Sequence, residues 1–558
     1  MMVMLFILLI FAAVQGGSPE SIPHRADSAP ENGPLAEAMV SMETFGGIRI
    51  AGDTLPFRRD MADFYRNRGY AMAWLAHGLP GKQARQVSDV VAESRLDGLD
   101  PGDYHAAALD SLLRLFSRKM FRRVYVDRKA DLELELLLTH AFLKLGADLL
   151  SGSRPWIEPD RWPLTAESWD LSRYLETLLA GGLDMGEGLQ RLAPPAPEYA
   201  IMKGWLAEYS RRKLLGGWPL VPEGPILGPG SEGERVVSLC LRLQASGDMV
   251  GQACVDSFSI SMQQGLGRFQ ARHGLKSTGV LDPPSLTQLN VPVEERLNQM
   301  RLNLEYWRWL PRNLGERHVR INLADFSLGA FEAGQAVLTM KVVIGRKEDR
   351  TPVFSDRMVA VVLNPAWNVP GSIAREELLP ELQKDPEFLS RHEMDLLSDA
   401  SDSAFLLRSD SVDWSAVSRE TFRFRVRQRP GAQNALGRVK FVLTNPYQIY
   451  LHDTPSIRYF QRSDRALSHG CVRLEKPLEL ASWALGPASG WDADNLSKEI
   501  GKEKVKTLPI PGGGIPVHIL YWTAFVDKQG VLHFRRDIYG LDRIIGQGAK
   551  LADEWKGM

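Results

Sequence analysis

The stretches YQIYLHDTP at residues 447–455 and SHGCVRL at residues 468–474 decide the fold of the chemically important part of this chain. The first alternates like a β-strand and then turns, and the second places a cysteine directly after a glycine. A thiol is a weak nucleophile until it is ionised, and an imidazole within hydrogen-bond reach assists that ionisation. Gly470 allows the close backbone approach that an oxyanion site of N–H groups needs. The two stretches therefore predict that Cys471 is a nucleophile paired with a histidine.

Two histidines are candidates for the base. His469 lies two residues before Cys471, so both side chains would share one face if this segment is extended. His452 would come from a neighbouring strand, with its ring oriented by a carbonyl group in the turn behind it. The residues alone leave both candidates open, together with the alternative of a buried cysteine beside a solvated loop.

The region around these stretches reads as a β-rich domain with one interruption. Strand-like segments occur at residues 318–322, 329–340, 358–363, 422–427 and 439–443. Residues 371–430 break this pattern with charged helical segments. We interpret 371–430 as a helical insertion, which is either a cap over a site or an inert surface excursion.

The chain upstream of this domain has helical periodicity. Residues 55–215 predict a helical scaffold domain, and a Gly/Pro-rich linker follows at 216–232. Residues 233–292 predict three helices, the last of which begins at Asp282–Pro283. Residues 293–316 predict a connecting helix, whose aromatic end we expect to pack in the core rather than stack on sugars.

Composition limits the class of protein. A chain of 558 residues exceeds one hydrophobic core and predicts several domains. With 44% hydrophobic and 24% charged residues it is neither disordered nor a multi-spanning membrane protein. Lys and Arg number 67 against 68 for Asp and Glu, so no nucleic-acid partner is expected. The three cysteines allow one disulfide, between Cys240 and Cys254, and leave Cys471 as a free thiol.

The N-terminus indicates export. The run VMLFILLIFAAV at residues 3–14 matches the apolar part of a secretory leader, although no basic residue precedes it. We therefore expect residues 1–17 to be a signal peptide or, alternatively, an uncleaved membrane anchor. Residues 18–54 are rich in Pro, Gly, Ser and Glu and predict a flexible tether.

SHGCVR with an upstream histidine resembles the signature of the L,D-transpeptidase catalytic domain. Further segments resemble the large periplasmic subgroup of that family: VVIGR (342–346), TPVF (351–354), NPAWNVP (364–370), SIAR (372–375), RQRPG (427–431), NALGR (434–438), YWTA (521–524) and DIYG (537–540). Residues 269–289 resemble the peptidoglycan-binding module of cell-wall enzymes.

The resemblance implies roles for residues near the cysteine. Cys471 would be the nucleophile and His452 its general base, with the backbone carbonyl of Asp453 as the third member. His469 and Ser468 would shape the loop and steady the thiolate, and the N–H groups of Gly470 and Cys471 would face the oxyanion. The resemblance implies a substrate-binding set made of Ser468, Arg473, Asp453, Trp367 and Asn368, in which Arg473 either orients the loop or meets a substrate carboxylate.

The reaction implied is 3→3 cross-linking of peptidoglycan through a cysteine thioester, with release of D-Ala. The partners would be tetrapeptide stems and glycan, with carbapenem-type inhibitors trapping Cys471, in a periplasmic location and without any metal or cofactor. The alternatives are an L,D-carboxypeptidase with the same thiol, a sortase-like transpeptidase and a non-catalytic wall-binding protein.

The predicted fold is multidomain α+β. Its parts are a leader or anchor (1–17), a tether (18–54), a helical scaffold (55–215), a linker (216–232), a three-helix peptidoglycan-binding domain (233–292), a connecting helix (293–316), a mainly β catalytic domain (317–526) with the cap 371–430, and a C-terminal extension (527–558).

Overall fold

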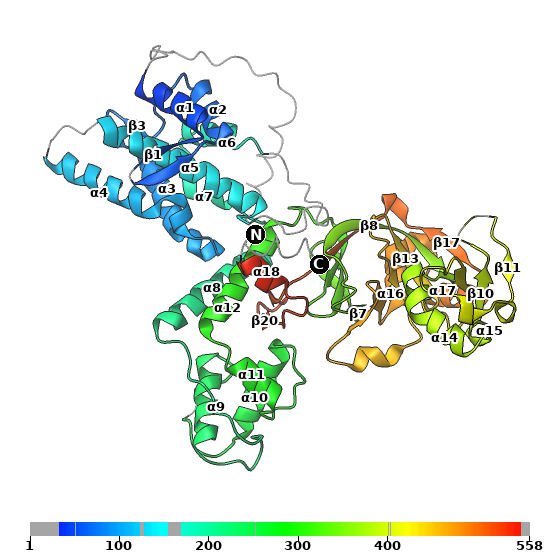
Figure 1. Ribbon diagram of the computed structural model, residues 1–558. Helices are drawn as coiled ribbons and strands as arrows, with labels where there is room; N and C mark the ends of the chain where they lie inside the picture. Colours follow the sequence, from blue (N-terminus) through cyan, green and yellow to red (C-terminus); the bar gives the residue numbers. More distant parts are fainter. Residues whose placement is uncertain are drawn as a thin grey trace. The chain divides into compact units, whose positions relative to one another are not determined.

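The computed structural model describes residues 33–50, 52–122, 128–154, 169–251, 253–399, 401 and 403–547. The expected leader 1–17 and residues 18–32 of the expected tether lie outside the described residues. The described residues belong to two compact units (Figure 1), the first drawn from Met1–Val91, Gly102–Lys144 and Trp169–Gly186, the second from Ala92–Pro101, Leu145–Ser168 and Glu187–Met558. Within the described chain, no helix combines the length and the apolar character needed to cross a membrane.

The first unit is mainly helical. Its helices are α1 (Pro34–Phe45), α2 (Arg59–Asn67), α4 (Ala106–Arg122), α6 (Leu171–Ala180) and most of α3 (Lys82–Glu93) and α5 (Arg128–Ser151). Two short antiparallel ribbons accompany them: β1 (Gly47–Ile50) with β2 (Asp53–Pro56), and β3 (Leu75–Ala76) with β4 (Leu79–Pro80).

The prediction of a flexible tether is wrong for residues 33–54, because α1, β1 and the start of β2 lie there. Leu35, Met39 and Met42 are spaced three and four residues apart and are buried along one side of α1. Pro34 occupies the first turn of that helix, where its missing N–H costs nothing. The polar composition averaged over 18–54 concealed this amphipathic helix.

The second unit contains the predicted three-helix segment, with α9 (Glu234–Ala245), α10 (Ile260–Arg272) and α11 (Pro283–Leu289) around an apolar core of their own. The Asp282 carboxylate accepts from the Ser285 N–H and so caps α11, which confirms the predicted helix start. A disulfide joins Cys240 to Cys254. The remaining cysteine, Cys471, is free.

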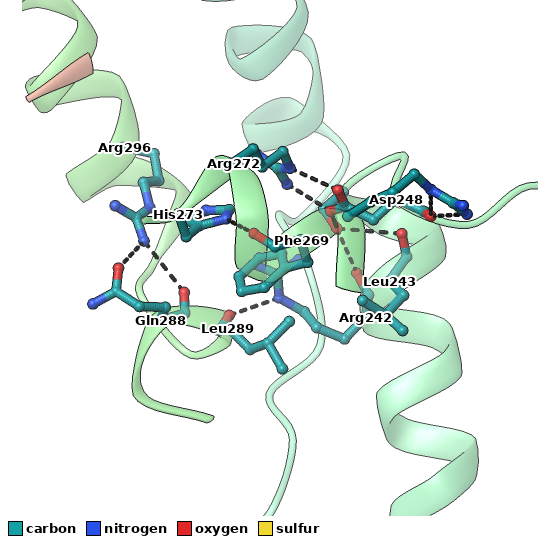
Figure 2. A network of polar contacts seen from close by, with 11 residues as sticks. Arg242, Leu243, Asp248, Phe269, Arg272, His273, Gln288, Leu289 and Arg296 are labelled. Carbon is teal, nitrogen blue, oxygen red and sulfur yellow. Dashed lines mark hydrogen bonds and ion pairs between the residues drawn. The ribbon is translucent and has the colours of Figure 1, made fainter. Parts of the chain in front are cut away.

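Charged side chains make polar contacts within this three-helix segment and between the segment and α12 (Val293–Arg308), as Figure 2 shows. Arg272 donates from Nε and Nη2 to the two Asp248 oxygens, each at 2.6 Å. Arg242 donates from Nε to the Leu289 carbonyl at 2.7 Å, and Arg296 of α12 donates to Gln288. These contacts fix the segment against the connecting helix.

We expect Asp248→Asn to destabilise this segment by about 3 kcal/mol, because the change removes the buried carboxylate that pairs with the mostly buried Arg272 guanidinium. Hydrogen exchange of the α10 amides should report this loss as a lower free energy of local opening. Asp110→Asn is the matched control, measured by exchange of the amides of its own helix α4, because the Asp110–Arg114 pair is exposed and such pairs contribute little. Equal losses in both variants would contradict the role of burial.

The largest element of the second unit is a ten-stranded sheet whose strand order is β13-β14-β16-β7-β6-β5-β18-β8-β17. Because β13 also pairs with β8, the sheet closes on itself, and β15 pairs with β7 beside this ring. The strands are β5 (Arg317–Asn322), β6 (Ser327–Glu332), β7 (Gln335–Gly345), β8 (Phe354–Leu363), β13 (Val439–Leu443), β14 (Leu451–His452), β15 (Ala466–Ser468), β16 (Val472–Leu474), β17 (Lys506–Pro509) and β18 (Ile515–Leu520). The predicted hairpin around Ala333–Gly334 is confirmed between β6 and β7.

The insertion contains helices and also a small sheet. The sequence predicted one strand of that sheet, at 422–427, and the sheet begins at residue 367, before the predicted bounds 371–430. Strands β9 (Trp367–Asn368), β10 (Met394–Leu397), β11 (Leu406–Leu407) and β12 (Arg425–Gln428) pair in the order β11-β10-β12-β9. Helices α13 (Gly371–Ile373), α14 (Leu379–Lys384) and α15 (Phe388–Arg391), with the π-helical turn η3 (Ala374–Leu378), pack with this sheet around Leu382, Trp414 and Val426. Except for β12, these strands were not predicted, because two to four residues are too few to show an alternating pattern.

The boundary predicted at 526/527 divides a hairpin and is therefore wrong as a domain limit. Strand β19 (Ala524–Val526) pairs with β20 (Leu532–Phe534), and α18 (Leu541–Gln547) follows. In α18, the Asp542 carboxylate accepts from the Tyr306 hydroxyl of α12 at 2.7 Å. Trp307 of α12 stacks on Trp522 with a centroid distance of 4.5 Å and is buried, which confirms the prediction of core packing for the aromatic end of this helix.

Candidate active site

Cys471 lies between β15 and β16 in a loop that is held by its own hydrogen bonds. Gly470 has a φ of 110°, a conformation that other residues rarely adopt, which explains the glycine before the cysteine. The Ser468 hydroxyl donates to the Cys471 carbonyl at 2.6 Å and accepts from the Gly470 N–H at 3.2 Å. Ser468 therefore fixes the backbone on both sides of the cysteine Cα.

The register of β14 and β16 determines which side chains share a face with the cysteine. These strands are parallel neighbours, and Leu451 pairs with Val472. Both residues are fully buried, so side chains one position away on either strand point to the opposite face of the sheet. Tyr450, His452 and Cys471 are in such positions. The predicted pair of His452 and Cys471 is thus brought to one face.

Tyr450 connects the members of this group. Its hydroxyl and its backbone N–H act to lower the pKa of Cys471, and its ring centroid lies 5.7 Å from that of His452. The Cys471 sulfur itself donates to the Gln448 carbonyl at 3.9 Å. Lys440 pairs with His452 across β13 and β14, and its Nζ lies 3.9 Å from the Tyr450 ring centroid. Three adjacent strands therefore contribute these side chains.

His452 is buried, and the turn behind it fixes its ring. Its Nδ1 lies 2.5 Å from the Asp453 carbonyl and donates there when protonated, and the Leu436 backbone is a second partner of the ring. Burial, with a smaller contribution from the Arg473 charge, lowers the pKa of His452 to about 3. The imidazole is therefore neutral at ordinary pH and able to accept a proton.

The environment of Cys471 favours the neutral thiol at rest. Burial raises the pKa of the thiol, while the hydrogen bonds from Tyr450 and the charges of Lys440 and Arg473 act in the opposite direction. The pair of Cys471 and His452 thus has a proton on sulfur and an unprotonated imidazole nitrogen. Burial disfavours both the thiolate and the imidazolium on their own, so the proton would pass to His452 only as the sulfur attacks.

His469 does not take the position expected from an extended segment. Its Nε2 lies 2.5 Å from the Glu377 Oε1 of η3, in the insertion, because the backbone turns at Gly470. Arg346 Nη2 lies 3.9 Å from the same Glu377 oxygen. His469 therefore contacts the insertion, and His452 remains as the base candidate that shares a face with Cys471.

The predicted oxyanion donors need a second correction. The Gly470 N–H already donates to Ser468 Oγ, so it does not point to a substrate. The Asp453 carboxylate is also engaged, since it accepts from the Arg438 N–H at 2.8 Å and from the Thr454 N–H at 2.7 Å. Its side chain stabilises the turn after β14, and only its carbonyl contacts His452.

The other predicted substrate residues lie around this group. Arg473 pairs with His452 in the β14–β16 register, is half-buried, and its Nε has no hydrogen-bond partner among the described residues. Trp367 and Asn368 form β9, at the edge of the small sheet of the insertion. Trp367 hydrogen-bonds to the Tyr450 side chain, while Asn368 is exposed.

Sequence reasoning missed Tyr450 and Lys440. Tyr450 stands two residues before His452 in an alternating strand, so the period of two was a signal that could have found it. Lys440 required the pairing of β13 with β14, which the sequence does not disclose.

Comparison with known proteins was informative for two segments. Residues 316–519 match the family model described as the L,D-transpeptidase catalytic domain, and residues 59–206 match that of a scaffold domain. A protein of Haemophilus influenzae, named provisionally as an L,D-transpeptidase, is 36% identical over 225 residues, or 40% of this chain and 44% of that protein. The match thus spans less than half the length of that relative.

Solved structures show weaker similarity. An L,D-transpeptidase from Stackebrandtia nassauensis is 12% identical with a TM-score of 0.21, over 54% of this chain and 96% of that chain. An LD transpeptidase in complex with imipenem is 12% identical with a TM-score of 0.18, over 37% and 59% of the two chains. Similarities of this size do not bear on function.

Proposed function

We propose that the protein joins peptidoglycan stems through a thioester on Cys471, on the premise that residues 316–519, which match the L,D-transpeptidase catalytic domain, work as such a domain. The observation that carries this proposal is the shared face of Cys471, Tyr450 and His452, with His452 Nδ1 held by the Asp453 carbonyl. It is the arrangement that a thiol nucleophile with a neutral imidazole base requires.

In the acylation step the donor is a tetrapeptide stem. The Cys471 sulfur forms a bond to the carbonyl carbon of the third residue while its proton passes to His452. The tetrahedral intermediate then collapses, the C–N bond to the terminal D-Ala breaks, and the proton moves from His452 to the departing amine. The products are a thioester on Cys471 and free D-Ala.

In the second step the acceptor is the side-chain amine of the third residue of another stem. Its nitrogen attacks the thioester carbonyl and gives its proton to His452, and the C–S bond breaks as that proton returns to the sulfur. The product is a 3→3 cross-link, and the free thiol is restored.

Other side chains support binding in this proposal. The half-buried guanidinium of Arg473, on the same face, suits a carboxylate of the stem. Trp367 reaches the site through its hydrogen bond to Tyr450, so the insertion would cover the donor as a cap. The Cys471 N–H, rather than that of Gly470, would face the oxyanion.

The remaining parts of the proposal concern place and partners. The segment 233–292 would bind or position glycan, and imipenem, bound by the LD transpeptidase described above, would acylate Cys471. Because the stems lie outside the cytoplasm, the protein would act in the periplasm. The apolar run at 3–14 would direct its export, as a cleaved leader or as a membrane anchor.

The test is incubation of the full chain with disaccharide-tetrapeptide, followed by mass spectrometry of protein and products. We expect an acyl adduct on Cys471, free D-Ala and dimers linked 3→3. Tripeptide stems without dimers would instead identify an L,D-carboxypeptidase. If neither an adduct nor a product forms, acyl transfer by this thiol is refuted.

A further inference from the structure

Three motifs that the catalytic pair does not use converge on the carbonyl beside Cys471. Gly345 lies in VVIGR and is the last residue of β7, Thr351 begins TPVF in the loop after β7, and Tyr539 lies in DIYG near the C-terminus. The Thr351 Oγ1 donates to the Gly470 carbonyl at 2.6 Å and accepts from the Gly345 N–H at 2.9 Å. Because the hydroxyl has one proton and the Gly345 N–H occupies a lone pair, that proton is directed to the Gly470 oxygen.

Tyr539 holds Thr351 in this position. Its hydroxyl donates to the Gly345 carbonyl at 2.5 Å and accepts from the Thr351 N–H at 3.3 Å. Its own N–H donates to the Tyr521 hydroxyl, which donates to Asp537 at 2.6 Å. Thr351 and Tyr539 are both buried, so these bonds are protected from competition by water.

Close packing leaves this arrangement little freedom. A Cβ at Gly345 would contact the Asp349 carbonyl and lie 2.7 Å from the Thr351 nitrogen. The glycine therefore lets the Thr351 backbone approach the end of β7 closely enough for its hydroxyl to reach Gly470.

The Gly470 carbonyl and the Cys471 N–H belong to one peptide plane, and in a trans peptide they point in opposite directions. Whatever holds the carbonyl consequently sets the direction of the N–H. We propose that Thr351 and Tyr539 are positioning residues, which hold the Gly470–Cys471 peptide so that the Cys471 N–H meets the oxyanion formed during acylation. The inference rests on the proposed function and extends it to residues outside the catalytic loop.

The test compares two reactions of the same sulfur in the full chain. Imipenem acylates through a tetrahedral oxyanion, whereas iodoacetamide alkylates by direct displacement and forms none. Thr351→Val removes the hydroxyl at nearly constant volume and is expected to slow acylation roughly 10- to 100-fold, with alkylation changed by less than about threefold. Thr351→Ser keeps the hydroxyl and should restore acylation to within about threefold of the wild-type rate.

Tyr539→Phe keeps the stacking on Tyr521, whose centroid lies 5.8 Å away, and should show the same selective loss to a smaller degree. If Thr351→Val does not fold, the comparison of acylation with alkylation is made with Tyr539→Phe instead. Tyr199→Phe is the matched control, since its buried hydroxyl bonds to Asp97 and not to the loop, and its two rates should stay equal to those of the wild type.

Wild-type acylation in Thr351→Val and Tyr539→Phe, or a parallel fall of acylation and alkylation, would overturn the positioning role. If the wild type itself is alkylated but never acylated, the proposed function fails, and the inference fails with it. The wild-type arm therefore separates the two failures.

Discussion

Cys471→Ser should lower the rate of acyl transfer from disaccharide-tetrapeptide by roughly 10⁴-fold or more, because a serine hydroxyl is a far weaker acid than a thiol and His452 cannot ionise it to a useful degree. Mass spectrometry should find neither the stem adduct nor D-Ala above background. Serine differs from cysteine by one atom, so the loop bonds from Ser468 to the backbone should persist.

The double variant Cys240→Ser with Cys254→Ser is the matched control, since it removes the other two cysteines and keeps Cys471. It should lose about 3 kcal/mol of stability in the three-helix segment through the lost disulfide. Acyl transfer at Cys471 should continue below the unfolding temperature of that segment. An adduct that persists in Cys471→Ser would show that another residue is the nucleophile.

The structural role of a residue was predictable from sequence where it depends on neighbouring residues in the chain. Asp282 caps α11 because an aspartate before a proline acts on its own next turn, and the hairpin at Ala333–Gly334 is likewise fixed by its turn residues. Cys471 was predictable as a nucleophile from its own segment, but the residues alone left His452 and His469 open as its base. The register of β14 with β16 and the contact of His469 with Glu377 were needed to separate the two histidines.

Residues whose placement depends on distant partners were not predictable. The direction of His469 depends on Glu377, which lies 92 positions away in the insertion. The predicted donor role of the Gly470 N–H failed because Ser468 takes that bond, a choice that only the loop geometry determines. The link from Thr351 to Gly470 spans 119 positions, and the sequence supplies the motifs without their connection.

His452→Ala should lower acyl transfer roughly 10²- to 10⁴-fold, the usual contribution of a general base. His469→Ala is the matched variant, and its loss should be much smaller, because the His469 ring bonds to Glu377 rather than to the cysteine. Acylation by imipenem, followed by mass spectrometry, measures both. A greater loss in His469→Ala would reverse the assignment of the base.

The pH dependence of the wild type tests the protonation state of the same pair. Burial lowers the pKa of His452 to about 3 and raises the pKa of Cys471. The thiol and the imidazole are therefore both neutral between about pH 5 and pH 8. Acylation draws on this neutral pair and should be nearly independent of pH there. Alkylation by iodoacetamide needs free thiolate and should rise about tenfold for each pH unit. A thiolate–imidazolium pair at rest would instead make alkylation level across this range, because the sulfur would already be ionised at pH 5.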